Sequence, residues 1–208
     1  MIVSILITIV ASYLLGNLNG AIVVSHLVAH EDVRTKGSGN AGLTNFTRNY
    51  GSGSSIFVIL IDMGKAVLSC MLGGWLLGRY GHYHDGVALG GLFLILGHNF
   101  PALLGFRGGK GILSGWFIAW MIDWRVGLLI AVVFFGNYFL THLVSMSSVL
   151  AAATFAVGFA FFHWGNPFVV AGCGFMGALT IFQHRANIDR LLKGQEKKVD
   201  LFKLGKKS

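Results

Sequence analysis

The sequence GSGNAGLTNFTR, residues 37–48, is a polar, glycine-rich stretch that lies between two apolar segments, residues 2–28 and 54–77. Each of these segments has the length of roughly 20 apolar residues that a helix needs to cross a bilayer. A second polar stretch, GHNFPALLGFRGGKG at residues 97–111, again lies between apolar segments. Hydrocarbon tolerates exposed backbone amides and charges poorly, so irregular polar loops survive there only where they line a wet or protein-buried cavity. The alternation therefore indicates a polytopic membrane protein with a functional cavity.

The composition excludes a soluble globular domain. Hydrophobic residues make up 54% of the 208 residues and charged residues only 12%, whereas soluble chains carry roughly 25% charged residues. The mean hydropathy of +0.69 agrees. This length accommodates a single polytopic membrane domain, which we place at residues 1–208. The formal net charge of +8 could suggest nucleic-acid binding, but the sequence has no basic-aromatic module, and we expect no nucleic-acid partner.

Seven apolar segments are the candidate membrane-spanning helices. They cover residues 2–28, 54–77, 87–105, 111–122, 126–143, 147–163 and 167–183. The fourth segment is short for a full span, and Asp-Trp-Arg at 123–125 predicts a tight turn into the fifth. Five spans are an alternative if residues 111–143 are re-entrant or partly interfacial. We predict an all-α integral membrane protein with seven transmembrane helices.

The distribution of positive charge predicts the orientation. Eight of the 16 Lys and Arg residues lie in a basic tail at residues 184–208. With this tail in the cytosol and an odd number of spans, the N-terminus lies outside. The cytosolic loops and tail then hold 13 Lys and Arg residues, and the opposite side holds two, Arg79 and Arg125. This ratio fits the positive-inside rule. Both glycine-rich stretches fall on the cytosolic face, where we expect the active site.

The first glycine-rich stretch has the chemistry of an anion site. GSGNAG at residues 37–42 formally matches G-x-G-x-x-G, but a dinucleotide-binding fold needs a preceding strand and a βαβ unit, and neither is present. The glycines allow backbone conformations in which successive N–H groups converge on one anion. Ser38, Thr44 and Asn45 add neutral donors. Arg48 adds a forked positive charge. The alternative is a polar loop in which Asn and Ser only form turns.

The second stretch brings two cations close to an apolar segment. GFRGGKG at residues 105–111 is not a Walker A loop, because Leu104 and Gly111 stand where that motif needs glycine and serine or threonine. Lys110 would still lie at a helix N-terminus, which favours anions. We expect Lys110 and Arg107 to contact phosphate. The alternative is that both charges only set the topology.

Two ionisable residues lie inside the second apolar segment. Asp62 and Lys65 are three positions apart, so they share a helix face and can pair. Ionisable residues within membrane spans are costly and are candidates for function. A purely structural ion pair is the alternative.

The end of the seventh segment holds another candidate pair. His184 and Asp189 have the spacing H-x-x-x-x-D of an acyltransferase motif in which the acid orients a histidine base. Residues five apart on a helix point about 140° away from each other, so that dyad needs a break in the helix. His184 and Asn187 are three apart and share a face. We therefore prefer them as the working pair, with Asp189 on the helix surface.

Together these residues resemble one family, the bacterial acyl-phosphate:glycerol-3-phosphate acyltransferases. The resemblance runs the length of the chain in four blocks: GSGNAGLTNFTR, GHNFPALLGFRGGKG, the region of Ser145, and HRANIDRLLKGQE from residue 184. It implies a seven-helix, multi-pass enzyme of the bacterial cytoplasmic (inner) membrane that acts in phospholipid synthesis. The implied reaction transfers a fatty acyl group from acyl phosphate to the 1-hydroxyl of sn-glycerol 3-phosphate. The implied products are 1-acylglycerol 3-phosphate (lysophosphatidic acid) and inorganic phosphate.

The resemblance also implies roles for individual residues. Those that resemble the family's phosphate-holding loop are Ser38, Gly39, Asn40, Gly42, Thr44 and Asn45. The polar walls around the two substrates are implied to be Arg48, Lys110, Ser145, His184 and Asn187. Candidates for a supporting role are Asp62, Lys65 and Glu196. Direct attack without a covalent acyl-enzyme is implied, with a substrate phosphate as a candidate proton acceptor. We expect no cofactor, and no cluster of acidic ligands suggests a metal.

Two positions depart from the family pattern. GNLNG at residues 16–20 stands where a Gly-Ser-Ile-Pro type of sequence is usual, and Ala66 follows Lys65 where glycine is usual. Both changes affect local helix geometry, and neither removes a charged group. The resemblance therefore still implies an active enzyme.

Functions from other classes remain as alternatives. A transporter or channel for phosphate or a phosphorylated solute would share the glycine-rich loops, but it should expose polar groups to both faces of the membrane. An acyltransferase with a thioester donor would work through His184 and Asp189. A membrane scaffold without chemistry would leave the clustered phosphate donors unexplained.

Overall fold

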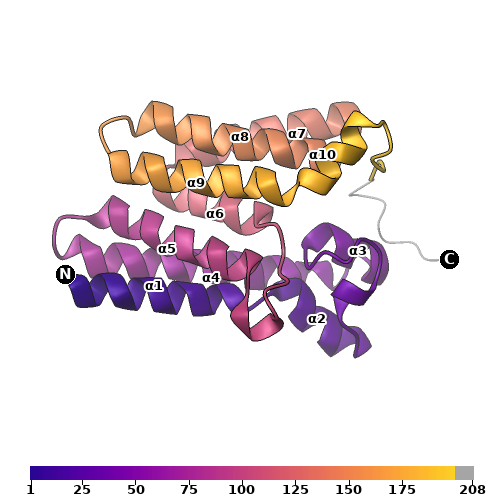
Figure 1. The fold of residues 1–208 in the computed structure, drawn as a ribbon, viewed down its shortest axis with the longest axis horizontal. Coiled ribbons are helices and arrows are strands. Elements are labelled where there is room, and N and C mark those ends of the chain that lie inside the picture. Colours follow the sequence, from indigo (N-terminus) through magenta and orange to yellow (C-terminus); the bar gives the residue numbers. More distant parts are fainter. Residues whose placement is uncertain (200–208) are drawn as a thin grey trace.

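The computed structural model describes residues 1–199, and every regular element in this part of the chain is helical (Figure 1). The α-helices are α1 (Ile2–Asn17), α2 (Gly20–Ala29), α3 (Leu43–Tyr50), α4 (Ser55–Gly78), α5 (Tyr83–Asn99), α6 (Ile112–Ile122), α7 (Trp124–Thr141), α8 (Val144–Phe162), α9 (Pro167–Gln183) and α10 (Arg185–Leu192). Two short 3-10 helices are η1 (Val33–Thr35) and η2 (Ala102–Leu104). The prediction of an all-α fold is confirmed. Of the predicted basic tail, residues 200–208 lie outside the described residues.

The long helices form two layers with α6 between them. In Figure 1, α1, α4 and α5 lie in one layer and α7, α8 and α9 in the other. The short helix α6 contacts α4 and α5 on one side and α7 on the other. The main apolar core runs through this junction, with fully buried Leu94 from α5, Ile118 from α6 and Phe159 from α8. Burial of these side chains holds the two layers together.

The helices agree with five or six membrane spans by length and apolar composition. Five stretches are long enough, and the number is six if α9 and α10 form one bent span. The first predicted segment is interrupted at Leu18. The fourth corresponds to α6, whose 11 residues extend about 16 Å at 1.5 Å per residue, against a hydrocarbon core of about 30 Å. The seven-helix prediction is therefore supported for five or six spans, and a crossing by α6 stays a prediction.

Close contacts between the helices depend on glycines. Added Cβ atoms on Gly73 of α4 and Gly86 of α5 would each overlap the other residue's carbonyl oxygen. A Cβ on Gly90 would overlap the carbonyl oxygen of Ser69. The backbones of α4 and α5 therefore touch along their length, which allows a tight interface without large side chains.

Three interruptions in the helices provide polar backbone near one end of the bundle. After α1 the chain breaks at Leu18, and Oδ1 of Asn19 caps α2 by accepting from the amide of Ile22 at 3.1 Å. The chain enters α6 only after Gly111, whose φ of 82° is in the left-handed region. At His184 the direction changes by 56° between α9 and α10. These breaks leave the space in which the site forms.

Candidate active site

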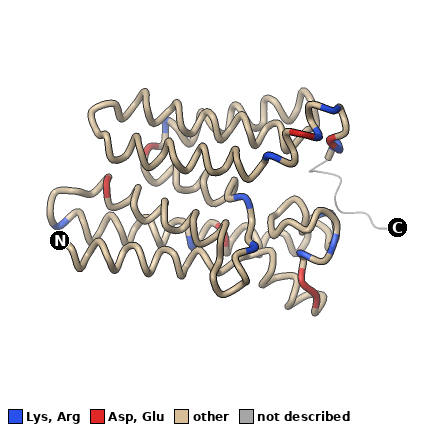
Figure 2. Tube along the Cα trace, in the orientation of Figure 1, with Lys and Arg blue, Asp and Glu red and all other residues tan. Residues whose placement is uncertain are grey.

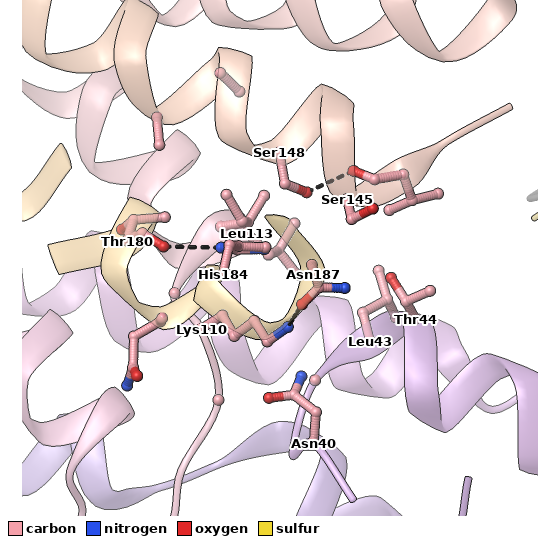
Figure 3. Close-up of a pocket in the computed structure, with 18 of the residues that line it drawn as sticks. Asn40, Leu43, Thr44, Lys110, Leu113, Ser145, Ser148, Thr180, His184 and Asn187 are labelled. Carbon is pink, nitrogen blue, oxygen red and sulfur yellow. Dashed lines mark hydrogen bonds between the residues drawn. The ribbon is translucent and has the colours of Figure 1, made fainter. Parts of the chain in front are cut away.

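A cavity of about 1040 Å³ lies where the glycine-rich loops meet α6, α8 and the α9–α10 bend (Figure 3). Thirteen of the predicted residues line it: Ser38, Gly39, Asn40, Gly42, Thr44, Asn45, Arg48, Asp62, Lys110, Ser145, His184, Asn187 and Glu196. The structure thus brings all four sequence blocks to one cavity. Figure 3 shows Asn40 and Thr44 on one side of Lys110, and His184 and Asn187 on the other.

The loop at residues 37–42 is braced from inside by Asn45. The Nδ2 group of this buried side chain donates to the carbonyl oxygens of Val33, Lys36 and Asn40, each at 3.1 Å, and its Oδ1 accepts from the amide of Ser38 at 3.0 Å. The sequence predicts Asn45 as a donor to phosphate. Its hydrogen-bonding groups are instead engaged within the loop, so we now assign Asn45 to shaping it.

Several donors in this loop remain available to a ligand. The side chains of Ser38, Asn40, Thr44 and Arg48 line the cavity and make no hydrogen bond with any described residue. Gly42 caps the N-terminus of α3 without a side-chain cap, so the first amides of that helix are not occupied by one. A helix N-terminus, neutral donors and an arginine together form a setting that favours an anion.

A chain of polar contacts crosses the opposite wall. The ammonium group of Lys110 donates to Oδ1 of Asn187. Nδ2 of Asn187 donates to Oε1 of Glu196 at 2.8 Å, and Nε of Arg190 donates to Oε2 of Glu196 at 2.6 Å. Glu196 therefore fixes the orientation of the Asn187 amide, and that amide holds Lys110 against the cavity. Arg190 was not among the predicted site residues, although it lies in the fourth sequence block.

The electrostatics of this wall favour an incoming anion. Burial lowers the pKa of Lys110 to about 8, and the positive charges of Arg190 and Arg185 add to this effect. Burial opposes ionisation of Glu196, yet hydrogen bonds from Asn187 and Arg190 hold its pKa below the usual value. A phosphate beside Lys110 would add negative charge next to the ammonium group, where Glu196 alone within residues 1–199 opposes the effect of the two arginines.

His184 and Asp189 do not form a dyad. Nδ1 of His184 donates to the carbonyl oxygen of Thr180 at 2.8 Å, which leaves Nε2 as the acceptor of the neutral ring. The exposed carboxylate of Asp189 pairs with Nζ of Lys193 at 2.9 Å. The prediction that Asp189 lies on the helix surface is confirmed.

Ser145 lies in the first turn of α8 and is buried against the cavity. Its Oγ makes no hydrogen bond of ordinary geometry, although it is close enough to influence Glu196. A buried hydroxyl without a full partner favours a ligand that supplies one. Among residues 1–199 no histidine hydrogen-bonds to Oγ of Ser145, so no histidine–serine pair of the kind that activates a serine nucleophile is formed there.

Two predicted residues lie elsewhere. Arg107 is exposed and outside the cavity wall, so its predicted contact with phosphate is corrected: the loop that carries Lys110 inward carries Arg107 outward. Lys65 is buried behind the cavity, where its Nζ pairs with Oδ1 of Asp62 at 2.8 Å. The predicted pairing of Asp62 and Lys65 is confirmed.

Arg34 joins the two glycine-rich loops, a role that sequence reasoning missed. Its Nη1 donates to the carbonyl oxygens of Leu104 at 2.8 Å and Arg107 at 3.0 Å, and its Nε bonds both oxygens of Asp32. In the sequence Arg34 is one more cytosolic charge. In the structure it holds the loops together through contacts across 70 and 73 positions.

The cavity continues from its polar end into an apolar channel. Aromatic and aliphatic side chains of the central helices line this part: Leu113, Trp116, Phe117, Ile130, Phe134, Phe135, Ala151, Ala152, Phe155 and Met176. Ser145 and Phe155 both line it from α8, and ten residues of helix correspond to about 15 Å. One continuous space therefore joins charged and apolar surroundings.

Comparison with known proteins identifies the family. The chain matches the family model described as glycerol-3-phosphate acyltransferase over residues 6–194. A glycerol-3-phosphate acyltransferase of Thermoanaerobacter sp. is 34% identical over 193 residues, covering 93% of this chain and 94% of the relative. One of Anaeromyxobacter dehalogenans is 38% identical over 193 residues, covering 91% and 94%. The chain belongs to the glycerol-3-phosphate acyltransferase family.

Solved structures agree with this assignment. The acyltransferase is similar to PlsY, described as an integral membrane glycerol 3-phosphate acyltransferase, in its glycerol 3-phosphate form: the TM-score is 0.85, the identity is 30%, and 97% of this chain and 98% of that chain are covered. For the lysophosphatidic acid form the TM-score is 0.82 with 29% identity and the same coverage. The acyltransferase is therefore an integral, multi-pass membrane enzyme of phospholipid synthesis, and the predicted family is confirmed.

Proposed function

We propose that the acyltransferase takes its acyl group from acyl phosphate and transfers it to the 1-hydroxyl of sn-glycerol 3-phosphate. The products are 1-acylglycerol 3-phosphate (lysophosphatidic acid) and inorganic phosphate. The observation that carries the proposal is the single cavity that joins a donor-rich, cationic end to an apolar channel. An acyl phosphate likewise has an anionic phosphate group at one end, joined to an apolar acyl chain. The descriptions of the PlsY structures name glycerol 3-phosphate and lysophosphatidic acid, which supports the acceptor and the product.

Two anionic substrates must meet in this cavity, and their repulsion has to be offset. Lys110 and Arg48 both line the cavity and provide positive charge. Ser38, Asn40 and Thr44 provide neutral donors, together with the backbone amides at the start of α3. Charge-assisted hydrogen bonds of this kind are the strong ones. Fixing both substrates near each other then supplies much of the acceleration.

The transfer proceeds by direct attack. The hydroxyl oxygen of glycerol 3-phosphate forms the new bond to the acyl carbon, the bond from that carbon to the phosphate oxygen breaks, and inorganic phosphate leaves with the electron pair. The hydroxyl proton passes to a substrate phosphate oxygen. Lys110 and Asn187 stabilise negative charge as it develops and orient the donor. His184 and Ser145 complete the polar wall. Among the described residues no histidine hydrogen-bonds to Oγ of Ser145, which supports a route without an acyl-enzyme.

The orientation follows the charge distribution. Figure 2 shows most of the lysines and arginines at the end of the bundle that carries α3 and α10. We assign this end, with the cavity, to the cytosolic face, with the N-terminus outside and the C-terminus in the cytosol. The enzyme then resides in the bacterial cytoplasmic (inner) membrane, with the surrounding lipids and the two substrates as its partners. Seven crossings follow if α6 completes a span with its flanking loop.

Release of inorganic phosphate tests the donor. The purified enzyme in lipid is supplied with palmitoyl phosphate, with and without glycerol 3-phosphate, and parallel reactions contain a palmitoyl thioester instead. We expect phosphate release that requires glycerol 3-phosphate, with lysophosphatidic acid formed only from the acyl phosphate. Turnover with the thioester alone would overturn the assignment of acyl phosphate as the acyl donor. Movement of phosphate across sealed vesicles without turnover would instead favour the transporter that the sequence left open.

A further inference from the structure

We infer that His98, a residue of α5 outside the predicted set, contacts a substrate directly, with its Nε2–H donating to a phosphate oxygen. The inference rests on the proposed function for the nature of the ligand. It starts from the position of the ring. His98 is only 3% exposed and lies in the wall of the cavity.

The backbone of His98 is bonded to the loop that carries Lys110. The carbonyl oxygen of His98 accepts from the amide of Gly109 at 3.1 Å, and that of Asn99 accepts from the amide of Gly108 at 3.2 Å. The ring is therefore held directly behind the Lys110 loop. A substrate phosphate that contacts Lys110 comes close to the same part of the wall.

The hydrogen bonds of Lys65 determine the tautomer of His98. Nζ of Lys65 lies 2.8 Å from Oδ1 of Asp62, 2.8 Å from the carbonyl oxygen of Leu18 and 2.8 Å from Nδ1 of His98. An ammonium group has three donors and no acceptor. Nδ1 of His98 must therefore accept, which places the ring proton on Nε2.

The proton on Nε2 has no partner of its own. Among residues 1–199 the ring makes one hydrogen bond, from Lys65 to Nδ1, and none through Nε2. A donor in the wall of a cavity can bond to an acceptor that a ligand supplies. Phosphate oxygens are strong acceptors, and the lysine two positions beyond Gly108 attracts them to this wall.

Gly109 packs against Nε2 of His98. A Cβ on Gly109 would overlap Nε2 of His98 and would lie 2.7 Å from the carbonyl oxygen of Ala41. Glycine at this position therefore lets the ring lie between the two loops without steric overlap. The same geometry brings Nε2 close to both phosphate-binding loops.

Two substitutions separate a substrate contact from a structural role. In His98→Asn the amide oxygen replaces Nδ1 as the acceptor for Lys65, and the donor at Nε2 is lost. In His98→Gln the amide nitrogen replaces Nε2 as the donor. If Nε2 contacts phosphate, His98→Asn should lower kcat/KM at least about tenfold and His98→Gln less than about threefold. The KM values assign the contact to glycerol 3-phosphate or to the acyl phosphate.

The opposite order would overturn the inference, because it would show that the ring serves only to accept from Lys65. Equal activity of both variants and the wild type would overturn it as well. His163→Asn is the matched control, since His163 pairs with Asp123 outside the cavity. Thermal unfolding of each variant shows whether it folds.

Binding of glycerol 3-phosphate alone, measured by calorimetry, should weaken in His98→Asn more than in His98→Gln if the contact is to the acceptor substrate. This measurement does not depend on the identity of the acyl donor. A failure of the acyl-phosphate proposal can therefore be distinguished from a failure of the inference about His98. A nitrogen NMR spectrum of the histidine rings in the wild-type enzyme provides a check that needs no substitution. The Nε2 signal of the ring bonded to a lysine ammonium should shift when glycerol 3-phosphate or palmitoyl phosphate is added, and not when glycerol is added. No shift with either phosphate would overturn the inference.

Discussion

The ammonium group of Lys110 donates a hydrogen bond to Oδ1 of Asn187, a residue 77 positions further along the chain. This contact joins the second glycine-rich loop to α10 and closes one wall of the cavity. Glu196 holds the other end of the same amide. The position of the cation is therefore set by residues from two distant sequence blocks.

Lys110→Met should lower kcat/KM more than tenfold. Tenfold corresponds to about 1.4 kcal/mol, and a charge-assisted contact to phosphate contributes at least that much. Steady-state kinetics of the enzyme in lipid measure the effect. Lys193→Met is the matched control, because Lys193 pairs with exposed Asp189 and does not line the cavity. Near-wild-type kinetics of Lys110→Met would exclude Lys110 from the site.

The two arginines of the glycine-rich blocks should differ in effect. Arg48 lines the cavity and Arg107 does not. Arg48→Ala should therefore cost more than about tenfold in kcat/KM, and Arg107→Ala less than about threefold. Both substitutions remove the same charge, so their ratio separates contact with substrate from long-range attraction. Equal losses would show that only the net charge matters.

The pH dependence should report the charge of Lys110. Its pKa of about 8 is below the ordinary value for lysine, so the ammonium is present at lower pH and is lost as the pH rises through 8. If only the charged form binds phosphate, kcat/KM falls over this range. In Lys110→Arg the fall should move to higher pH, because arginine keeps its charge. An unchanged profile would assign the fall to another group.

Substitutions of Glu196 and Asp189 should distinguish direct transfer from acyl phosphate from catalysis by a histidine–aspartate dyad with a thioester donor. Glu196→Gln should lower kcat/KM at least about tenfold, because it weakens the hold on Asn187 and Arg190. Asp189→Asn should change it less than about twofold, because an exposed ion pair contributes little. A large loss in Asp189→Asn alone would favour a histidine–aspartate dyad and a thioester donor.

The contact between α4 and α5 gives a prediction for stability. Gly73→Ala should destabilise the enzyme by about 1–3 kcal/mol, because the added methyl group overlaps the carbonyl oxygen of Gly86 and the helices must separate. Thermal unfolding in detergent measures the change. Gly64→Ala on the same helix meets nothing within 4 Å and should leave the unfolding temperature unchanged or raised.

Much of the site could be predicted because polar residues are conspicuous in an apolar chain. Lys110, His184 and Asn187 were found in this way, and all three line the cavity. The direction of each side chain could not be predicted. Arg107 and Lys110 are three positions apart in one loop, and only the folded loop shows that one faces out and the other in.

The remaining differences also depend on long-range contacts. The bracing role of Asn45 requires the carbonyl oxygens of Val33 and Lys36 to converge on it. The tautomer of His98 depends on Lys65, 33 positions away. The break after α1 lies at Leu18, an apolar residue without a neighbouring proline. Periodicity therefore predicted the helices, and tertiary contacts determined where they stop.

The length of α6 also has a consequence for how such an enzyme can be altered. The helices around α6 are long enough to hold the scaffold in the bilayer without it, and its first turns form part of the chamber wall. Adding or removing residues at its N-terminus would therefore resize the chamber while the outer frame stays the same. A change in the length of α6 could therefore change the size of the substrate that fits, while the membrane-spanning helices stay the same.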